Sequence, residues 1–382
     1  MKIAEVRTHA GYSAEFERNI TLVQVVTDSG LEGWGDCGLS GKERATVECV
    51  HEFRDWLVGQ DAFRSEHIWQ DLFRGSFWRG GPVIMTAISA IDTALWDVKG
   101  KALGVPVWQL LGGAVRDRVR VYQNPGGRTP EEMAERALAL IERYGYSALK
   151  LGPHAPGAEK MPWNAVLRGA EARIKAVREA VGPDIDIGLD PHAKIFEPAK
   201  ALQMARAVAP YNPYFFEEPL RPENIDAMAS FKRDCPIPVA TGECLYTKFE
   251  FRDLIAREAA DIIQPDVCLM GGLMEMKKIA AIAEASYVVV APHNPMGPVA
   301  TAVNVHFCAS TPNFAILEYN PDDRGPRRDL VREPLAVKDG YIELPTAPGL
   351  GIDLDESAFE KYPYKPWKRT SPIRPDGSIG FN

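Results

Sequence analysis

The chain has 382 residues, 46% of them hydrophobic and 25% charged, and a formal net charge of −8 at pH 7. This length favours two domains, and the composition is that of an ordinary folded protein. The acidic balance argues against a nucleic-acid partner, which requires a basic surface, and no apolar run approaches the roughly 20 residues of a membrane span.

The N-terminal residues contain no apolar signal core, and the six cysteines form no CxxC pair. Neither a disulfide framework nor a zinc knuckle is therefore indicated. We expect a cytoplasmic protein with no membrane partner and no nucleic-acid partner.

Residues 1–116 predict an α+β unit. The run 20–26 is apolar and β-branched, and residues 28–30 read Asp-Ser-Gly and turn the chain into residues 31–34, which indicates a β-hairpin. From 45 to about 112, apolar side chains recur at spacings of three and four residues, which is the helical period. Strands followed by helices are typical of an α+β domain.

From residue 119 onward, short apolar runs alternate with helical stretches. Eight buried strands that alternate with helices predict a (β/α)₈ barrel. The strands are expected at residues 119–122, 147–151, 185–189, 214–216, 238–240, 261–263, 287–290 and 314–317. Helices are expected at residues 129–144, 165–181, 199–208, 248–258 and 275–284.

The segment after about Glu318 is rich in Pro and Gly and is too short to form a domain. A hairpin is expected at 335–344 around Asp339-Gly340. The polar stretch 366–382 becomes ordered only if another part of the chain holds it, and we expect the segment to return to the N-terminal unit. The chain is thus divided into residues 1–116, 117–325 and 326–382.

Six residues with functional side chains follow the last six predicted strands at regular intervals. Their separations of 27, 26, 23, 27 and 25 residues each match one strand and one helix. All six are therefore expected at the carboxyl-terminal face of the barrel, where barrel enzymes have their active sites. These residues are Asp190, Glu217, Glu243, Asp266, His293 and Glu318.

Three successive acids, Asp190, Glu217 and Glu243, predict a metal site. Carboxylates that converge on one rim repel one another unless a hard cation lies between them, and oxygen ligands at a partly open octahedral site suit Mg²⁺. The competing interpretation is that each acid caps the following helix, which is common for one residue but not for three in succession. Glu218 is instead expected to begin a helix or to form a salt bridge, because strand alternation turns it away.

Two histidines are candidates for proton transfer. His293 ends the seventh strand, and Asp266 at the end of the sixth can accept its Nδ1 proton, which orients the imidazole and raises its basicity. His192 follows the third strand and is expected to face the same site. We expect structural roles for His154, in a Gly/Pro loop, and for His306, in an apolar helix.

Lys150 ends the second strand, where its ammonium group either binds a substrate carboxylate or pairs with the nearby acids. Glu318 ends the eighth strand, where a carboxyl group held protonated would donate a hydrogen bond to a developing oxyanion. The alternative role for Glu318 is to cap a helix.

These residues stand in motifs that resemble the enolase superfamily over nearly the whole chain. The motifs are GLDPH, FFEEPL, TGE, IIQPD and APHNPMGP, preceded by RGGPVIMTAISAIDTALWDVKGKALGVPVWQLLGG at residues 79–113. The resemblance to the mandelate racemase subgroup implies an α+β capping domain, a modified TIM barrel of the (β/α)₇β type, and a Mg²⁺ ion that chelates the substrate carboxylate. It also implies a homo-oligomer.

The second strand distinguishes the chain from the racemases of this superfamily. Those enzymes carry Lys-x-Lys, whose second lysine is a base, whereas this chain reads Lys150-Leu151-Gly152. The third strand instead offers Asp-x-His, which is similar to D-galactonate dehydratase and related acid-sugar dehydratases. Galactonate dehydratases usually read Gly-Glu-Arg after the fifth strand, and Cys244 stands here in place of that arginine, which leaves the substrate open.

The resemblance thus implies a hydro-lyase whose partner is a small sugar acid, an aldonate or an aldarate. His293 would remove the C2 proton, and His192 would protonate the departing 3-hydroxyl group. Lys150 and Glu318 would stabilise the oxyanion, and the product after tautomerisation would be a 2-keto-3-deoxy acid.

Two loops, at residues 11–19 and 76–81, are expected to close over the substrate. Arg18, Trp78 and Arg79 in these loops are candidates for contacts with substrate hydroxyl groups.

Four other functions remain open on the sequence alone. A racemase or epimerase, and a cycloisomerase that acts on a lactone or anhydro sugar acid, would belong to the same superfamily. A catalytically inactive homologue that binds sugar acids is less compatible with the full set of acids and both histidines. A metal-dependent hydrolase barrel would need several metal-binding histidines, whereas these strand ends carry mainly carboxylates.

Overall fold

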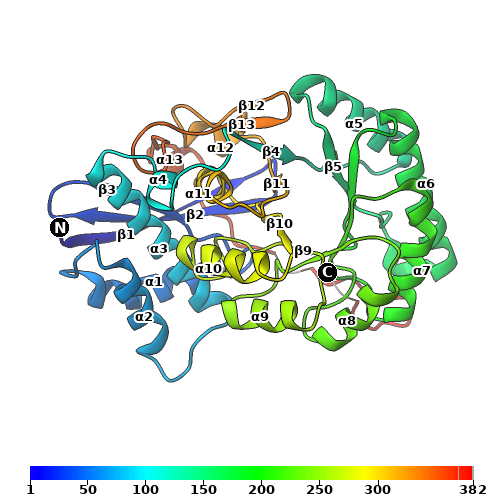
Figure 1. The fold of residues 1–382 in the computed structure, drawn as a ribbon, viewed down its shortest axis with the longest axis horizontal. Coiled ribbons are helices and arrows are strands. Elements are labelled where there is room, and N and C mark those ends of the chain that lie inside the picture. Colours follow the sequence, from blue (N-terminus) through cyan, green and yellow to red (C-terminus); the bar gives the residue numbers. More distant parts are fainter. Residues whose placement is uncertain (369, 381–382) are drawn as a thin grey trace.

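The computed structural model describes residues 1–368 and 370–380, in which an α+β capping domain lies beside a modified (β/α)₇β barrel (Figure 1). The capping domain contains a three-stranded antiparallel sheet in the order β1-β2-β3, covered by helices. Its elements are β1 (Ile3–Ser13), β2 (Arg18–Thr27), β3 (Glu32–Asp36), α1 (Glu43–Leu57), α2 (Ser65–Arg74), α3 (Pro82–Leu103) and the short α4 (Val107–Leu110).

The first of the two expected loops, residues 11–19, is largely strand. β1 and β2 pair in register as far as Ser13 and Arg18, so the connection is only the short turn at residues 14–17. Within that turn Glu17 has the left-handed φ of 52°. The prediction of a loop over residues 11–19 was therefore wrong, and Arg18 begins β2 next to the hairpin turn.

Close packing between β3 and α3 joins the two layers of the capping domain. A Cβ atom added to Gly35 would lie 1.9 Å from the carbonyl oxygen of Ala90, and one added to Gly33 would lie 2.0 Å from that of Ala94. Only glycine allows the strand to approach the helix backbone so closely.

Replacing Gly35 by alanine is therefore expected to destabilise the protein by about 3 kcal/mol, because the three atoms nearest the added Cβ all belong to the backbone of Ala90 and cannot move aside. The matched control is Gly169→Ala, since Gly169 lies inside a helix with nothing within 4 Å of the added Cβ. That control should be neutral or stabilising by about 0.5–1 kcal/mol. Equal melting temperatures for the two variants would contradict the close approach of β3 to α3.

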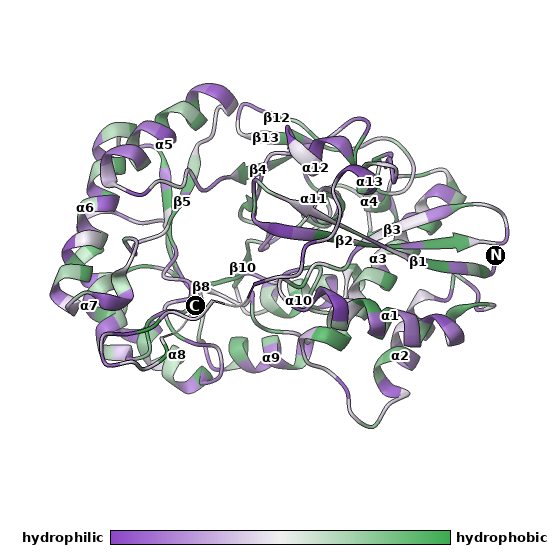
Figure 2. Cartoon of the chain, turned by 180° about the vertical axis from the view of Figure 1, so that it is seen from behind, coloured by the Kyte–Doolittle hydropathy of each residue, from purple (hydrophilic) through white to green (hydrophobic). Residues whose placement is uncertain are grey.

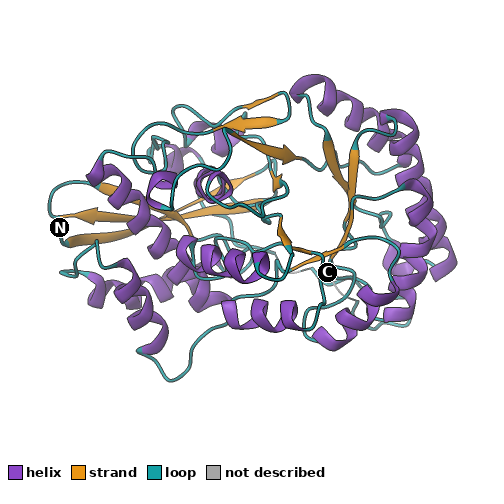
Figure 3. Cartoon of the chain, viewed as in Figure 1, coloured by secondary structure: helices purple, strands orange, loops and turns teal. Residues whose placement is uncertain are grey.

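The barrel consists of eight short strands and seven connecting helices, with the helices on the outside (Figure 3). The strands are β4 (Arg118–Tyr122), β5 (Ala148–Leu151), β6 (Asp186–Leu189), β7 (Phe215–Glu217), β8 (Val239–Thr241), β9 (Ile262–Ile263), β10 (Val289–Val290) and β11 (Leu317–Glu318). The helices are α5 (Pro130–Tyr144), α6 (Trp163–Val181), α7 (Pro198–Val208), α8 (Ile225–Asp234), α9 (Lys248–Ala256), α10 (Leu273–Glu284) and α11 (Pro298–Ala309). Two 3₁₀ turns lie at Ala158–Lys160 and Ala209–Tyr211.

The barrel closes through two single bridges in addition to its continuous pairings. Strands β5 to β10 form one parallel sheet, and β11 pairs in parallel with β4. A parallel bridge from Gln123 to Leu149 joins β4 to β5, and another from Val290 to Phe314 joins β10 to the residues before β11. The predicted barrel is thereby confirmed, and all its strand ends meet on one face.

Side chains of alternating size fill the barrel interior. Tyr122 and Phe215 supply aromatic rings, and Ala148, Ala240 and Ala291 supply small side chains in the same buried cluster. The helices bury apolar faces against the outside of the strands and expose polar faces (Figure 2). The interior is thus a packed core and not a channel, which confines a substrate site to the mouth.

The predicted hairpin near Asp339 joins the barrel. β12 (Val337–Lys338) and β13 (Tyr341–Glu343) are antiparallel, and Asp339 and Gly340 have the left-handed φ values of 51° and 76° that such a two-residue turn needs. β13 also pairs with β4, so this hairpin covers a barrel strand. The short helices α12 (Gly325–Asp329) and α13 (Ala358–Lys361) lie on either side of the hairpin in the sequence.

The chain beyond α13 returns to the capping domain. Pro363 forms an antiparallel bridge with Gly11, and Lys365 exchanges hydrogen bonds with Asn19, at 2.9 Å from Asn19 Nδ2 and 3.1 Å to Asn19 Oδ1. The predicted C-terminal segment, residues 326–382, includes 369 and 381–382, which lie outside the described residues. The division at 116 and 325 stays a prediction.

All six cysteines are unpaired. Among the described residues, the apolar stretches of the helices are too short for a bilayer crossing.

Candidate active site

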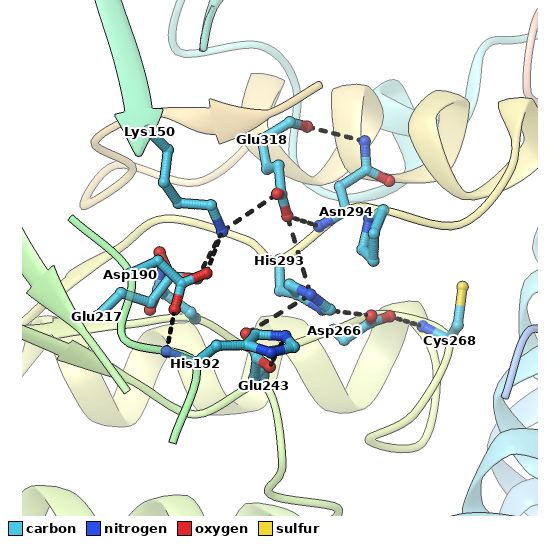
Figure 4. A network of polar contacts seen from close by, with 12 residues as sticks. Lys150, Asp190, His192, Glu217, Glu243, Asp266, Cys268, His293, Asn294 and Glu318 are labelled. Atoms are coloured by element: carbon cyan, nitrogen blue, oxygen red, sulfur yellow. Dashed lines mark hydrogen bonds and ion pairs between the residues drawn. The ribbon is translucent and has the colours of Figure 1, made fainter. Parts of the chain in front are cut away.

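Seven polar residues lie together at the carboxyl-terminal ends of the barrel strands (Figure 4). Each is held by a strand or by the first residues of the loop after it, because parallel strands deliver their last residues to the same face. They are Lys150 in β5, Asp190 after β6, Glu217 in β7, Glu243 after β8, Asp266 after β9, His293 after β10 and Glu318 in β11. The predicted strand-end residues therefore do come together.

Lys150 is the positive centre of this group. Its Nζ lies 2.6 Å from Glu217 Oε1, 3.2 Å from Glu318 Oε1 and 3.4 Å from Asp190 Oδ2. Burial alone would lower the pKa of this ammonium group, but the charges of Glu217 and Glu318 together with Asp190 raise it well above its ordinary value. Lys150 is therefore a permanent cation, paired with acids in the structure and placed to attract a further carboxylate.

The three acids predicted as metal ligands occupy the same rim. Glu217 is fully buried, and its pKa is raised well above the ordinary value by burial, while Asp190 and Glu243 add to the increase and Lys150 opposes it. Its other oxygen, Oε2, accepts a hydrogen bond from Gln264 at 2.8 Å. The rim thus carries more negative charge than Lys150 neutralises.

These acids do not yet enclose a metal position. Within the described parts of the chain, no three or more acidic, histidine or cysteine side chains already surround a point where a metal ion would sit. Lys150 holds two of the three carboxylates, Asp190 and Glu217. The donor chemistry nevertheless fits Mg²⁺, because oxygen ligands in a buried and uncompensated negative environment favour a hard cation.

His293 and Asp266 form the predicted dyad. The imidazole Nδ1 lies 2.8 Å from Asp266 Oδ2, and the other oxygen of Asp266 accepts a hydrogen bond from the backbone of Cys268 at 2.8 Å. The Nε2 atom faces the acids, 3.6 Å from Glu243 Oε2 and 3.9 Å from Glu318 Oε2. Asp266 therefore fixes the ring orientation and leaves Nε2 toward the site.

The charge state of His293 depends on the neighbouring acids. Burial alone would lower the pKa of the imidazole. The negative charge of Glu243, the hydrogen bond with Asp266 and the negative charge of Glu318 together raise the pKa to about 10. An imidazole with that pKa is protonated at neutral pH. It can accept a proton from a substrate only when the charge of Glu243 is neutralised.

His192 approaches the same carboxylate from the third strand. Its Nε2 lies 3.8 Å from Glu243 Oε1, and its side chain is 55% exposed, whereas that of His293 is 14% exposed. The backbone is left-handed at His192, with φ of 57°, and the amide of this residue donates to Asp190 Oδ1 at 2.7 Å. Such conformations in residues other than glycine cost energy and cluster at functional sites. Both imidazoles therefore point toward Glu243, one from the open side and one from the buried side.

The expectation that Glu318 is protonated was wrong. Burial would raise the pKa of this carboxyl group, but Lys150, His293 and the backbone amide of Asn294 lower it to about 2. Asn294 donates to Glu318 Oε2 at 3.0 Å. Glu318 is thus an ionised acceptor that holds Lys150 and the loop after β10, and it cannot donate a hydrogen bond.

Glu218 also differs from its prediction. It begins no helix, and within the described residues it forms no ion pair; its Oε1 accepts hydrogen bonds from Thr241 Oγ1 and Gly242 N, each at 2.8 Å. The side chain is completely buried, and burial together with the charge of Glu243 raises its pKa to about 8. The chain leaves β7 at this point with a left-handed φ of 38°, so strand alternation no longer applies.

Of the three residues expected to contact substrate, only Arg18 reaches the site. Its guanidinium group donates to Pro295 O at 3.3 Å, and burial lowers its pKa while the charges of Glu318 and Asp266 raise it. Trp78 is 80% exposed on the loop between α2 and α3, which extends away from the body in Figure 1. Arg79 borders a surface hollow beside Phe249. Neither is bonded to the strand-end residues in the described part of the chain.

Sequence reasoning missed Gln264 and Asn294, which hold the carboxylates of Glu217 and Glu318. Both lie inside motifs that were identified, IIQPD and APHNPMGP, within two residues of Asp266 and next to His293. Buried amides beside functional strand-end residues were therefore a usable signal.

Comparison with known proteins gives matches over nearly the whole chain. The model of the mandelate racemase / muconate lactonizing enzyme N-terminal domain matches residues 6–112, and the enolase C-terminal domain-like model matches residues 132–358. A D-galactonate dehydratase from Ralstonia nicotianae is 39% identical over 369 residues, which cover 94% of this chain and 95% of that protein. A D-galactonate dehydratase from Pectobacterium atrosepticum is 36% identical and covers 99% of both chains.

Solved structures give the same result. An enolase from Agrobacterium radiobacter, a proposed galactarate dehydratase with bound sodium and L-malate, is 42% identical, with a TM-score of 0.95 and complete coverage of both chains. A proposed dehydratase from Salmonella enterica is 35% identical, with a TM-score of 0.89 and coverage of 94% of this chain and 98% of that one.

Proposed function

The chain belongs to the mandelate racemase / muconate lactonizing enzyme family of the enolase superfamily, and on that premise we propose that it is a Mg²⁺-dependent hydro-lyase that dehydrates a sugar acid. The observation that carries this proposal is the pair of imidazoles, His192 and His293, whose Nε2 atoms lie 3.8 and 3.6 Å from the two different oxygens of Glu243. Removal of a proton at C2 and loss of a hydroxyl group at C3 require one acid and one base in such an arrangement. The matching D-galactonate dehydratases perform a reaction of this class.

Asp190, Glu217 and Glu243 would hold the Mg²⁺ ion. Bound there, the ion would supply a fixed positive charge beside the substrate carboxylate, where negative charge develops when the C2 proton leaves. The sodium ion and L-malate bound by the Agrobacterium relative support a site of this family that takes a cation and a hydroxy acid.

His293 is assigned as the base. Its Nε2 faces the rim and Asp266 fixes the proton on Nδ1, so Nε2 would present its lone pair to the substrate once a bound cation neutralises the charge of Glu243. When it takes the C2 proton, it becomes an imidazolium ion, which is stabilised by the hydrogen bond that its Nδ1 donates to Asp266.

His192 is assigned as the acid. It is the more exposed of the two imidazoles, and we expect it to give a proton to the C3 hydroxyl group as the C–O bond breaks and water leaves. The resulting enol then tautomerises to a 2-keto-3-deoxy acid. Because this step needs a second proton donor, it separates a dehydratase from an enzyme that only moves the C2 proton.

Lys150, with Arg18 from the capping domain, provides the positive groups of the site. Since Glu318 is ionised, it positions Lys150 and the loop after β10, and we withdraw its assignment as a hydrogen-bond donor. The six unpaired cysteines support a reducing, cytoplasmic location. We also propose that the protein is a homo-oligomer, as the resemblance implies.

A racemase or epimerase remains the second candidate. The sequence of the second strand argues against this function. Lys150 is followed by Leu151 and Gly152, so the strand supplies no further lysine to serve as the opposite base. A cycloisomerase would use the same base on a lactone, and an inactive homologue would bind a sugar acid without turnover.

The test is a panel of aldonates, aldarates and their lactones, incubated with the protein and Mg²⁺ and assayed for 2-keto acid. We expect at least one aldonate or aldarate to be dehydrated with kcat/KM above about 10⁴ M⁻¹s⁻¹, the lower end for natural substrates. Exchange of deuterium at C2 without keto acid would select the racemase, and turnover of lactones alone would select the cycloisomerase. Binding of a sugar acid without either reaction would indicate a catalytically inactive homologue.

A further inference from the structure

A cavity of about 540 Å³ lies beside the candidate active site. Its walls include His154 from the loop after β5 and Lys194 from the loop after β6, the two strands that also position Lys150 and Asp190. Asp190 and His192 lie close enough to His154 for their charges to act on its imidazole. The cavity therefore lies next to the second and third strand ends, and none of the residues assigned to metal binding or proton transfer lines it.

The far wall of this cavity comes from the C-terminal end of the described chain. Residues 372–380 form a small hairpin in which Ile373 bridges Ile379, and Gly377 N donates to Arg374 O at 2.9 Å. Asp376 Oδ1 stabilises the turn by accepting bonds from the backbone and the side chain of Ser378, at 3.0 and 2.7 Å. The hairpin is thus held together by its own hydrogen bonds. Pro372, Arg374 and Gly380 of this hairpin line the cavity.

The connection to this hairpin is anchored on the capping domain. The reciprocal hydrogen bonds of Lys365 with Asn19 are joined by a hydrogen bond from Tyr12 N to Tyr362 O at 3.0 Å, and the ammonium group of Lys365 lies 4.2 Å from the centre of the Tyr12 ring. Figure 2 shows this segment running from α13 across to the barrel strands. The chain end is thereby brought to the barrel mouth from the far side of the molecule.

Three basic side chains lie on the cavity wall. Lys194, Lys200 and Arg374 line it together with two acids, Glu159 and Glu197. Lys200 is neutralised by Glu197 at 2.7 Å. Lys194 and Arg374 are both exposed, and among the described residues no carboxylate forms an ion pair with either of them, so both cations are available to pair with an anion in the cavity.

We propose that Lys194 and Arg374 bind the distal carboxylate of an aldarate, which makes the C-terminal hairpin a specificity element for diacid substrates. The proposal rests on the proposed function, in which the α-carboxylate of the sugar acid is held at the strand-end acids. An aldonate ends in a neutral hydroxymethyl group and leaves both cations unpaired, whereas an aldarate ends in a second carboxylate that pairs with them. The enzyme therefore prefers aldarates to aldonates of the same configuration.

The experiment compares kcat/KM for an aldarate and for the aldonate of the same configuration in the wild-type protein and in Arg374→Gln and Lys194→Gln variants. Each variant is expected to lower kcat/KM for the aldarate about 10- to 100-fold, the loss of a charge-assisted hydrogen bond, mainly through KM. The value for the aldonate should change less than about threefold. Lys368→Gln is the matched control, because Lys368 is an exposed basic residue of the same segment that does not line the cavity.

An aldarate-to-aldonate ratio that stays unchanged in both variants overturns the proposal, as does a wild-type protein that turns over aldonates only. If the wild-type protein makes keto acid from no substrate, the proposed dehydration fails. Calorimetric titration with the aldarate then tests separately whether Lys194 and Arg374 bind its distal carboxylate. Weaker aldarate binding by Arg374→Gln and Lys194→Gln than by Lys368→Gln supports the proposal, and equal binding by all three overturns it.

Discussion

Replacement of His293 by asparagine is expected to lower kcat by at least about 10³-fold, within the range that a general base contributes. Asparagine preserves much of the side-chain volume and the hydrogen bond to Asp266, but it offers no nitrogen that can accept a proton. Since the side chain of His293 is only 14% exposed and lies beside Asp266, a change in folding is excluded by comparing the circular dichroism and melting temperature of the variant with those of the wild-type protein. Activity within tenfold of the wild-type value would refute the base assignment.

His192→Asn separates the two histidines. This variant keeps the base, so in deuterium oxide it should exchange the C2 proton of the substrate for deuterium while it loses most of the elimination. His293→Asn should lose both exchange and elimination. The opposite pattern, exchange by His293→Asn and none by His192→Asn, would reverse the two roles.

The barrel was readable from the sequence because its strands are buried on both faces and therefore appear as continuous apolar runs. Each of the eight predicted runs overlaps an observed strand, and β7 and β8 differ from their predictions by one residue at each end. β1 went unpredicted because exposed and buried positions mix irregularly along it. The bounds of α11 were not predicted, because all its residues are buried and it therefore lacks the polar face that marks a helix in a sequence.

The sequence predicted those parts of the site whose positions depend only on where the barrel strands end. A strand-end position fixes where a residue such as Asp190 or His293 emerges, and the sequence contains that information. The charge of Glu318 was not readable, since it depends on Lys150, which lies 168 residues earlier in the chain. Arg374 was equally hidden, because only the folded chain brings the C-terminal hairpin to the loops after β5 and β6.

Removal of divalent metal by a chelator is expected to abolish turnover, and addition of Mg²⁺ to restore it. The physical reason is the crowding of Asp190, Glu217 and Glu318 around Lys150, with the charge of Glu243 acting on Glu217, which leaves negative charge that a cation relieves. A ligand at 100 times its Kd adds about 2.7 kcal/mol to the free energy of unfolding, so Mg²⁺ should also raise the melting temperature by several degrees.

Glu217→Gln isolates the metal site in this experiment, because the amide keeps the shape of the side chain and removes the charge at its most deeply buried carboxylate. The variant should lose activity by more than about 10²-fold and should no longer gain melting temperature from Mg²⁺. Glu223→Gln, at an exposed acid in the loop after β7, should behave as the wild-type protein in both measurements. A Glu217→Gln protein that is still stabilised by Mg²⁺ to the wild-type extent would show that the ion binds elsewhere, and Asp190 and Glu217 would then serve only to hold Lys150.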